Sequence, residues 1–441
     1  MGLSPAPNPL AVCCAENVAS DYVLSAMARA EWLLGRQDQE QREEDQEALV
    51  TTASKDYGSI LDTTTTINSS ERILVIGSGR CPLDLPEVCQ LFLGRIGYTA
   101  YMISVHLYLY GSLWMFTAVF GNAVAEYYFD SNSNSALDLD HYYQGAILGL
   151  TVLVLPLSCL QLTEQKLLQV LLTASRMLLM ILMVATPLWA AITGTSHFGD
   201  MSMDEDSNQS SLPLLVDWRG IHRMLPIVVC AAIFHFSIPA LATDLGRQNQ
   251  DQLSHIFAWT MVLVFVVYAS IGVTDALYFG GANNIRQSSN VNWAHYHGGT
   301  GRPIIRDDGV TIWIDVACVF PLHALVLGNS LMAVWYKDRT NPLQQNRWII
   351  SAFRIVAAVP PLIGGLYVRE LGTILDYNGI FGLAIAFVFP AWLYLSSTER
   401  CPSTIRTAYD RLGSSYPAAK SLLVFGVLAQ VTVFSLLVWR G

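Results

Sequence analysis

Long apolar runs dominate the chain beyond about residue 95, and few charged residues interrupt them. An α-helix rises 1.5 Å per residue, so about 20 apolar residues cross the roughly 30 Å hydrocarbon core of a bilayer. Backbone polar groups in lipid must be satisfied internally, and the alternating polarity of barrel strands is absent, so the runs are expected to be helices. The pattern predicts nine spans, at about 98–122, 142–163, 168–192, 224–244, 253–279, 312–336, 348–368, 377–398 and 420–439.

Composition supports this interpretation, because 52% of the residues are hydrophobic and only 14% are charged, against about 25% charged in soluble domains. We therefore predict an all-α, polytopic membrane protein in which residues 96–441 form the transmembrane bundle. Residues 1–95 carry the polar stretch 37–47 and Ser/Thr-rich sequence, which predict a mostly disordered cytosolic segment. Within it, 18–34 has the pattern of a short amphipathic helix, but its charged residues make it a poor span.

The charge distribution predicts which side each loop faces. If residues 1–95 are cytosolic and the spans alternate, the first external loop, 126–141, has no Lys or Arg, as the positive-inside rule favours. The Asn208 glycosylation sequon then falls outside, whereas the Asn68 sequon falls in the cytosol. None of the eight cysteines lies in a predicted external loop, so no disulfide framework is expected. Loop 399–420 is basic, which fits a cytosolic anchor.

Motifs for soluble chemistry are missing. Residues Ile73 to Gly79 look like a strand entering a nucleotide-binding turn, but the third glycine is absent and Pro82 follows. There is no Walker A sequence, no His-Glu-x-x-His, no serine elbow and no Cys-x-x-Cys pair. We therefore expect no enzyme activity, no cofactor, no metal ion and no nucleic-acid partner.

The run 224–243 is the best candidate for a binding site. Pro239 lacks an N–H donor and should free the carbonyl of His235, near the middle of the run. Secondary transporters place their sites where helices break at the midplane. A tolerated kink is the alternative for any one proline. Histidines 106, 235 and 323 lie inside runs, where hydrogen-bonded structure competes with a proton relay, and Arg176 is an intramembrane charge that suggests either function or snorkelling.

The residues around this run resemble the amino acid/auxin permease family, which includes vesicular, vacuolar and sodium-coupled neutral amino-acid transporters. The similarity covers about residues 88–440, and the order and spacing of its motifs carry it. They are His235-x-x-x-Pro239-x-x-x-x-Asp244, Tyr268-x-x-x-Gly272, Tyr278-Phe279-Gly280, Leu91-Phe92-Leu93-Gly94, Pro360, Leu371-Gly372 and the stretch from Asn378-Gly379 to Pro390.

The resemblance implies an eleven-helix, LeuT-like fold of two inverted repeats, with the substrate between broken first and sixth helices. Carried onto this chain, it implies substrate contacts from Phe234, His235, Phe236, Ser237 and Ile238, with Pro239 at the helix break. A zwitterionic amino acid suits such a site, because helix N-terminal N–H groups hold its carboxylate and freed carbonyls take its ammonium. An H⁺ or Na⁺ gradient would drive transport across the plasma membrane or a vacuolar or endosomal membrane.

The chain departs from the family pattern at its start. The nine runs match the third to eleventh helices, 18–34 is at best a remnant of the second, and the first is not recognised. One hypothesis is therefore secondary active transport of amino acids. The alternatives are an inactive truncated transporter, or a non-transporting nutrient sensor or scaffold that signals through residues 1–95. A seven-helix receptor does not fit nine runs.

Overall fold

The computed structural model describes residues 9–53, 73–74, 83–132, 136–160, 162–193, 221–244, 252–279, 310–336, 346–402, 406–410 and 415–440. Within these residues, eight helical stretches are long and apolar enough to cross a bilayer. This confirms the all-α, polytopic class. The long loops at 200–218 and 280–309, both glycosylation sequons and the turn after Leu74 lie outside the described residues.

All nine predicted spans are helical, and eight are continuous or nearly so. The eight are α2 (Leu85–Asn132), α3 (Ala136–Cys159), α4 (Leu162–Thr193), α7 (Leu253–Phe279), α9 (Val310–Tyr336), α10 (Arg347–Tyr367), the stretch formed by α11 (Leu371–Leu383), η6 (Ala384–Val388) and α12 (Phe389–Arg400), and α13 (Tyr416–Arg440). The ninth, predicted at 224–244, is interrupted and consists of α5 (Ile221–Ala232), η3 (His235–Ser237) and α6 (Ile238–Asp244).

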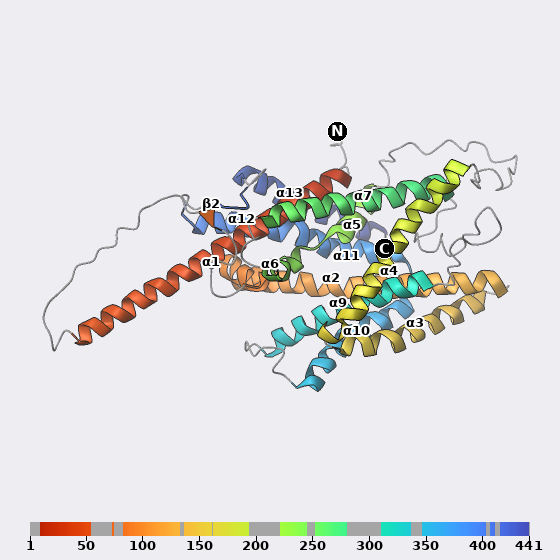
Figure 1. Cartoon of the computed structure of the whole chain (residues 1–441), viewed down its shortest axis with the longest axis horizontal. Coiled ribbons are helices and arrows are strands. Elements are labelled where there is room, and N and C mark those ends of the chain that lie inside the picture. Colours follow the sequence, from red (N-terminus) through yellow and green to blue (C-terminus); the bar gives the residue numbers. More distant parts are fainter. Residues whose placement is uncertain are drawn as a thin grey trace.

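Helix α2 runs through the length of the bundle and packs against α3, α9, α10 and α11 (Figure 1). Its side chains Phe92, Leu109 and Phe120 are fully buried. Near its start the helix is kinked at Gly94, whose φ of 71° and ψ of −168° are accessible almost only to glycine. The predicted span at 98–122 therefore begins just after this kink.

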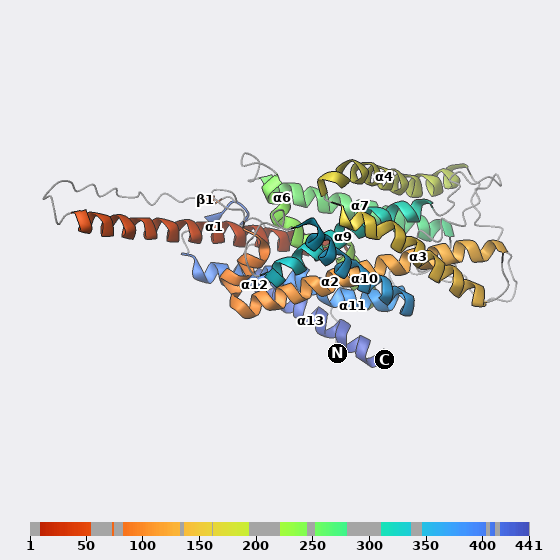
Figure 2. The ribbon, with the colours of Figure 1, turned by 90° about the horizontal axis from the view of Figure 1, so that it is seen from below.

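The α11–η6–α12 stretch lies at the centre of the fold, and α4, α7 and α13 lie at its edge. In the most apolar 18-residue window of each span, the buried share is 72% for the central stretch, against 12% for α4, 11% for α7 and 17% for α13. Helices α4 and α13 occupy opposite edges of the bundle in Figure 2. Their outward residues are large and apolar, such as Leu171, Ile181 and Phe434, which suits contact with lipid chains.

The main difference from the sequence prediction is α1 (Pro9–Ala53), a 45-residue helix in the part predicted to be mostly disordered. Residues 19–31 of α1 are all buried, and the helix packs against α7, α12, α5 and α2. The prediction gave too much weight to polarity. The charged residues of 18–34 are compatible with burial when they are paired, as Arg29 is, and the Glu, Gln and Arg of 37–47 are good helix formers.

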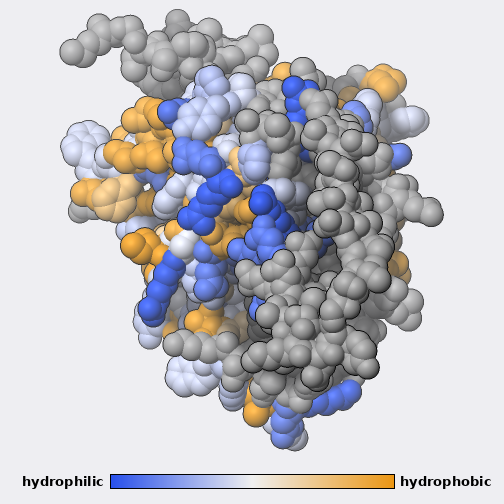
Figure 3. Space-filling model, turned by 90° about the vertical axis from the view of Figure 1, so that its left-hand side faces the viewer, coloured by the Kyte–Doolittle hydropathy of each residue, from blue (hydrophilic) through white to orange (hydrophobic). Residues whose placement is uncertain are grey.

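Beyond its buried part, α1 projects from one end of the bundle in both ribbon views (Figure 1, Figure 2). Figure 3 looks onto this end, where hydrophilic side chains are frequent and hydrophobic ones appear on the flank. The two short strands β1 (Ile73–Leu74) and β2 (Arg406–Thr407) pair in parallel, Ile73 with Arg406 and Leu74 with Thr407. This pairing brings the chain before α2 beside the chain after α12.

Candidate functional site

The interrupted helix has irregular backbone inside the described part of the bundle. Helix α5 ends at Ala232, and Phe234 leaves helical geometry with φ −136° and ψ 1°. A single 3₁₀ turn then leads into α6. Irregular backbone at membrane depth occurs where protein or a polar site surrounds it, because its N–H and C=O groups need partners that lipid cannot supply.

The break occurs earlier than the proline predicted. The His235 carbonyl, expected to be freed by Pro239, accepts a hydrogen bond from the N–H of Ile238, and the Ser237 N–H donates to the Phe234 carbonyl at 2.8 Å. The backbone forms a 3₁₀ turn, in which each carbonyl accepts a hydrogen bond from the N–H three residues later instead of four. The prediction of a free His235 carbonyl is therefore wrong, and the run is interrupted at Phe234, five residues before Pro239.

The structure divides the predicted site residues between the core and a partly exposed face. His235, Ile238 and Pro239 are buried, whereas Phe234, Phe236 and Ser237 are half-buried. The Phe234 ring packs edge-on against Phe257 of α7, with centroids 5.1 Å apart, and lies 5.0 Å from the His235 ring. Phe236 approaches Tyr108 of α2 at 6.1 Å. These aromatic contacts hold the turn between α2 and α7.

Polar groups from five elements meet around this turn. We call them the central cluster: Glu16 of α1, Tyr108 and Ser112 of α2, Cys230 of α5, His235 of η3 and Asn378 of α11. The His235 Nε2 lies 3.1 Å from the Glu16 carbonyl, so Nε2 carries the ring hydrogen and donates it. The Tyr108 hydroxyl donates to the Cys230 carbonyl at 3.3 Å and satisfies one acceptor at the end of α5.

Asn378 ties α11 into the same cluster. Its Nδ2 donates to the Ser112 hydroxyl at 3.1 Å and lies 3.9 Å from the Cys230 sulfur. Its amide overlies Gly111 so closely that a Cβ there would overlap it. Buried polar atoms of the cluster nevertheless remain without a hydrogen-bond partner. They are both carboxyl oxygens of Glu16, Nδ1 of His235 and Oδ1 of Asn378.

Unsatisfied buried polar atoms are costly, at about 1–3 kcal/mol each, so they are rare in native proteins and each calls for an explanation, such as a bound water, an ion or a catalytic role. Their concentration beside a broken helix makes the central cluster the strongest candidate for a binding site among the described residues. A ligand with donors and acceptors of its own would satisfy the Asn378 oxygen and the His235 nitrogen.

The other intramembrane polar residues considered in the sequence lie elsewhere. His323 hydrogen-bonds through Nδ1 to the Val319 carbonyl one turn earlier, at 3.1 Å, and packs on Phe116, which fits a structural role. His106 lies on α2 with its Nε2 buried and unsatisfied. Arg176 lies on α4, at the edge of the bundle, and has its own interactions. None of the three belongs to the central cluster.

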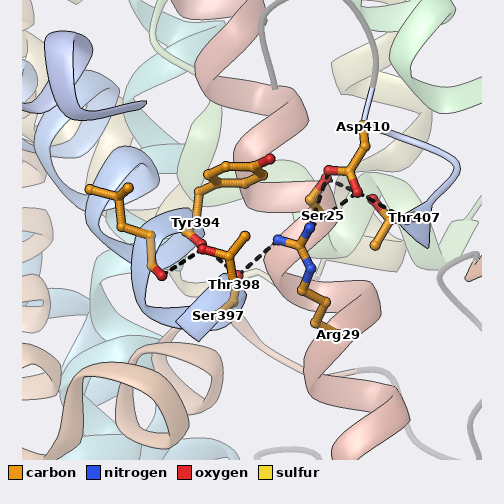
Figure 4. Close-up of polar contacts among 8 residues, drawn as sticks. Ser25, Arg29, Tyr394, Ser397, Thr398, Thr407 and Asp410 are labelled. Carbon is orange, nitrogen blue, oxygen red and sulfur yellow. Dashed lines mark hydrogen bonds and ion pairs between the residues drawn. The ribbon is translucent and has the colours of Figure 1, made fainter. Parts of the chain in front are cut away.

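A second polar cluster joins α1 to the chain after α12 (Figure 4). The Arg29 guanidinium donates to both Asp410 carboxylate oxygens, at 3.1 and 3.3 Å, and to the Ser397 hydroxyl at 3.1 Å. It also lies 4.9 Å from the centre of the Tyr394 ring. Asp410 accepts further hydrogen bonds from the Thr407 N–H and the Ser25 hydroxyl. This Arg29 cluster fixes α1 against α12 and β2.

Sequence reasoning found the broken helix but missed most of the partners around it. Asn378 was noted only as part of a motif, while Glu16, Tyr108, Ser112 and Cys230 were not considered as site residues. The available signal for Glu16 was the apolar, alanine-rich stretch 9–34 around it, of which only 18–34 was considered, as a poor span. Tyr108 and Cys230 give no sequence signal, because their role depends on helices far apart in the chain.

Comparison with known proteins finds relatives of low sequence identity. No family model matches. The chain is 19% identical over 371 residues to the Transmembrane protein 104 homolog of Drosophila melanogaster, covering 78% of this chain and 70% of that protein. It is 19% identical over 334 residues to human Transmembrane protein 104, covering 70% of this chain and 63% of that protein, less than two thirds of its length. The chain is a multi-pass membrane protein.

A further match is to a plant protein. The chain is 24% identical over 217 residues to the Amino acid transporter AVT6E of Arabidopsis thaliana, covering 46% of this chain and 40% of that protein. The name Transmembrane protein 104 states no activity, so the plant protein supplies the functional comparison.

Proposed function

We propose that this protein is a secondary active transporter of amino acids, driven by an H⁺ or Na⁺ gradient. The observation that carries the proposal is the interruption of a membrane helix within the central cluster, whose buried polar atoms lack partners. The resemblance to the amino acid/auxin permeases and the similarity to the plant transporter support it. In this proposal the bundle has the LeuT-like arrangement, and α5–η3–α6 corresponds to the sixth helix of that fold.

The interrupted helix offers carbonyl groups to the ammonium of a zwitterion. The last carbonyls of α5 lack partners within that helix, and those of Ala231 and Ala232 would attract an ammonium group. Phe234, Phe236 and the aliphatic Ile238 would contact the apolar part of the substrate. Because no cationic side chain is hydrogen-bonded to the described central cluster, we propose neutral amino acids as the substrate class.

The test is uptake by purified protein in proteoliposomes, with radiolabelled neutral amino acids and an imposed H⁺ or Na⁺ gradient. We expect one gradient to drive accumulation above that of protein-free liposomes. Phe234→Ala should raise KM at least several-fold, whereas Phe434→Ala, at a position 57% exposed on α13, should leave it unchanged. Absence of uptake with either gradient across the amino-acid panel would reject the proposal and favour the sensor or scaffold alternative.

A further inference from the structure

One titratable group of the central cluster, the Glu16 carboxyl, is buried without a hydrogen-bond partner. Its residue has no exposed surface, and neither carboxyl oxygen has a hydrogen-bond partner. A buried ionised carboxylate is stable only when it is paired or well hydrogen-bonded, since burial removes the water that would solvate its charge. A neutral, protonated carboxyl avoids most of this cost. The geometry therefore favours the protonated form.

The neighbours of Glu16 supply no compensating positive charge. The titratable groups that interact with its carboxyl are Cys13 on α1, Cys230 on α5 and Tyr108 on α2, all neutral when protonated. From η3, His235 hydrogen-bonds to the Glu16 backbone carbonyl through Nε2. From α12, Tyr394 stacks on Tyr22 instead, almost two turns farther along α1.

The basic residue nearest to Glu16 within α1 is Arg29. Arg29 is thirteen positions farther along the chain, or about 20 Å along the helix axis, and its guanidinium is bound to Asp410. Asp21, between them, has interactions of its own and adds no positive charge.

A metal cation fits this position less well than a proton. A bound cation needs several oxygen ligands arranged around it. No group of three or more His, Cys, Asp or Glu side chains among the described residues has the geometry of a metal site. A proton needs no such coordination shell.

We propose that Glu16 is a proton-binding site, protonated while α1 is packed against the interrupted helix and released when the two separate. The contact of His235 with the Glu16 carbonyl links this site to η3, so movement of the broken helix would alter the surroundings of the carboxyl. If the protein transports amino acids as proposed above, Glu16 carries the coupling proton. The protonation itself does not depend on that function.

Infrared spectroscopy of the full chain in lipid tests the protonation directly. A neutral carboxylic acid has a carbonyl stretch that an ionised carboxylate lacks. At neutral pH, we expect the wild-type protein to show such a band and Glu16→Gln to lose it. Glu40→Gln is the matched control, because Glu40 lies on the same helix but is exposed, and it should retain the band. Identical bands in the wild type and Glu16→Gln would overturn the proposal.

Two further measurements complete the test. Adding NaCl at neutral pH, with choline chloride as control, should leave the Glu16 band unchanged, and loss of the band with Na⁺ alone would show a cation site instead. Glutamine resembles the neutral acid in shape, so Glu16→Gln should fold with an unfolding temperature no lower than the wild type. A variant that fails to fold would indicate a required ionised carboxylate and overturn the proposal.

Transport then separates this inference from the proposed function. Glu16→Gln should lose accumulation driven by a pH gradient, whereas Glu40→Gln should keep it. Unchanged pH-driven accumulation in Glu16→Gln would contradict the coupling role. If the wild type transports no amino acid, the proposed function fails while the infrared result still decides whether Glu16 binds a proton.

Discussion

At the scale of single residues, the charges of α1 explain how a polar-looking segment packs in a membrane bundle. The Arg29 side chain is only 5% exposed and the Asp410 side chain is 16% exposed. Besides pairing with each other, Arg29 donates to the Ser397 hydroxyl and Asp410 accepts from the Thr407 N–H. Pairing of this kind replaces the water that both groups lose on burial. Charge content alone therefore could not decide whether residues 18–34 are buried.

The Arg29–Asp410 pair gives a prediction about stability. Asp410→Ala leaves a buried guanidinium without its counter-ion, so we expect the free energy of unfolding in detergent to fall by about 3–5 kcal/mol. Arg29→Met combined with Asp410→Ala should lose less than the sum of the single variants, because it removes both charges. Glu40→Gln, which breaks the exposed Arg36–Glu40 pair, should change stability by no more than about 1 kcal/mol. Strict additivity of Arg29→Met and Asp410→Ala would contradict this account.

At the scale of elements, helix positions could be predicted from the sequence, because the thickness of the bilayer sets the length of each apolar run. The boundaries of 253–279 agree with those of α7, and the break in 224–244 was expected from Pro239. The exact form of the break was not predictable, since a 3₁₀ turn depends on which carbonyls find partners. The packing of α1 depends on α7 and α12, more than 200 residues away in the chain, and no local pattern records those contacts.

The contact between α11 and α5 gives a prediction about helix packing. A Cβ at Gly379 would overlap the Pro226 ring and lie 3.0 Å from the Pro226 Cα. Gly379→Ala should therefore separate the two helices and lower the free energy of unfolding by about 1–3 kcal/mol. Gly372→Ala on the same helix is the control, because a Cβ there meets nothing within 4 Å. Thermal unfolding in detergent measures both, and equal effects would contradict the close approach.

At the scale of the whole molecule, the β1–β2 pairing supports the predicted topology. Ile73 lies beside Arg406, so both belong to the same side of the membrane. Eight predicted spans lie between them, and an even number of crossings returns the chain to the side where it started. Without a crossing at α5–η3–α6 the number would be odd. The interrupted helix is therefore expected to cross the bilayer, although which side is cytosolic stays a prediction from the charge distribution.

The central claim is that an amino acid binds at the interrupted helix, and Cys230 provides a native probe for it. Its thiol lies in the central cluster, 3.9 Å from Asn378 Nδ2, whereas Cys14 is exposed on α1 and Cys89 is buried in α2. The most direct measurement is the alkylation rate of each cysteine by a small membrane-permeant maleimide, followed by mass spectrometry with and without saturating neutral amino acids. We predict that at least one amino acid slows alkylation of Cys230 several-fold and leaves Cys14 unchanged. Alkylation of Cys230 at the same rate with every amino acid would contradict binding at this site.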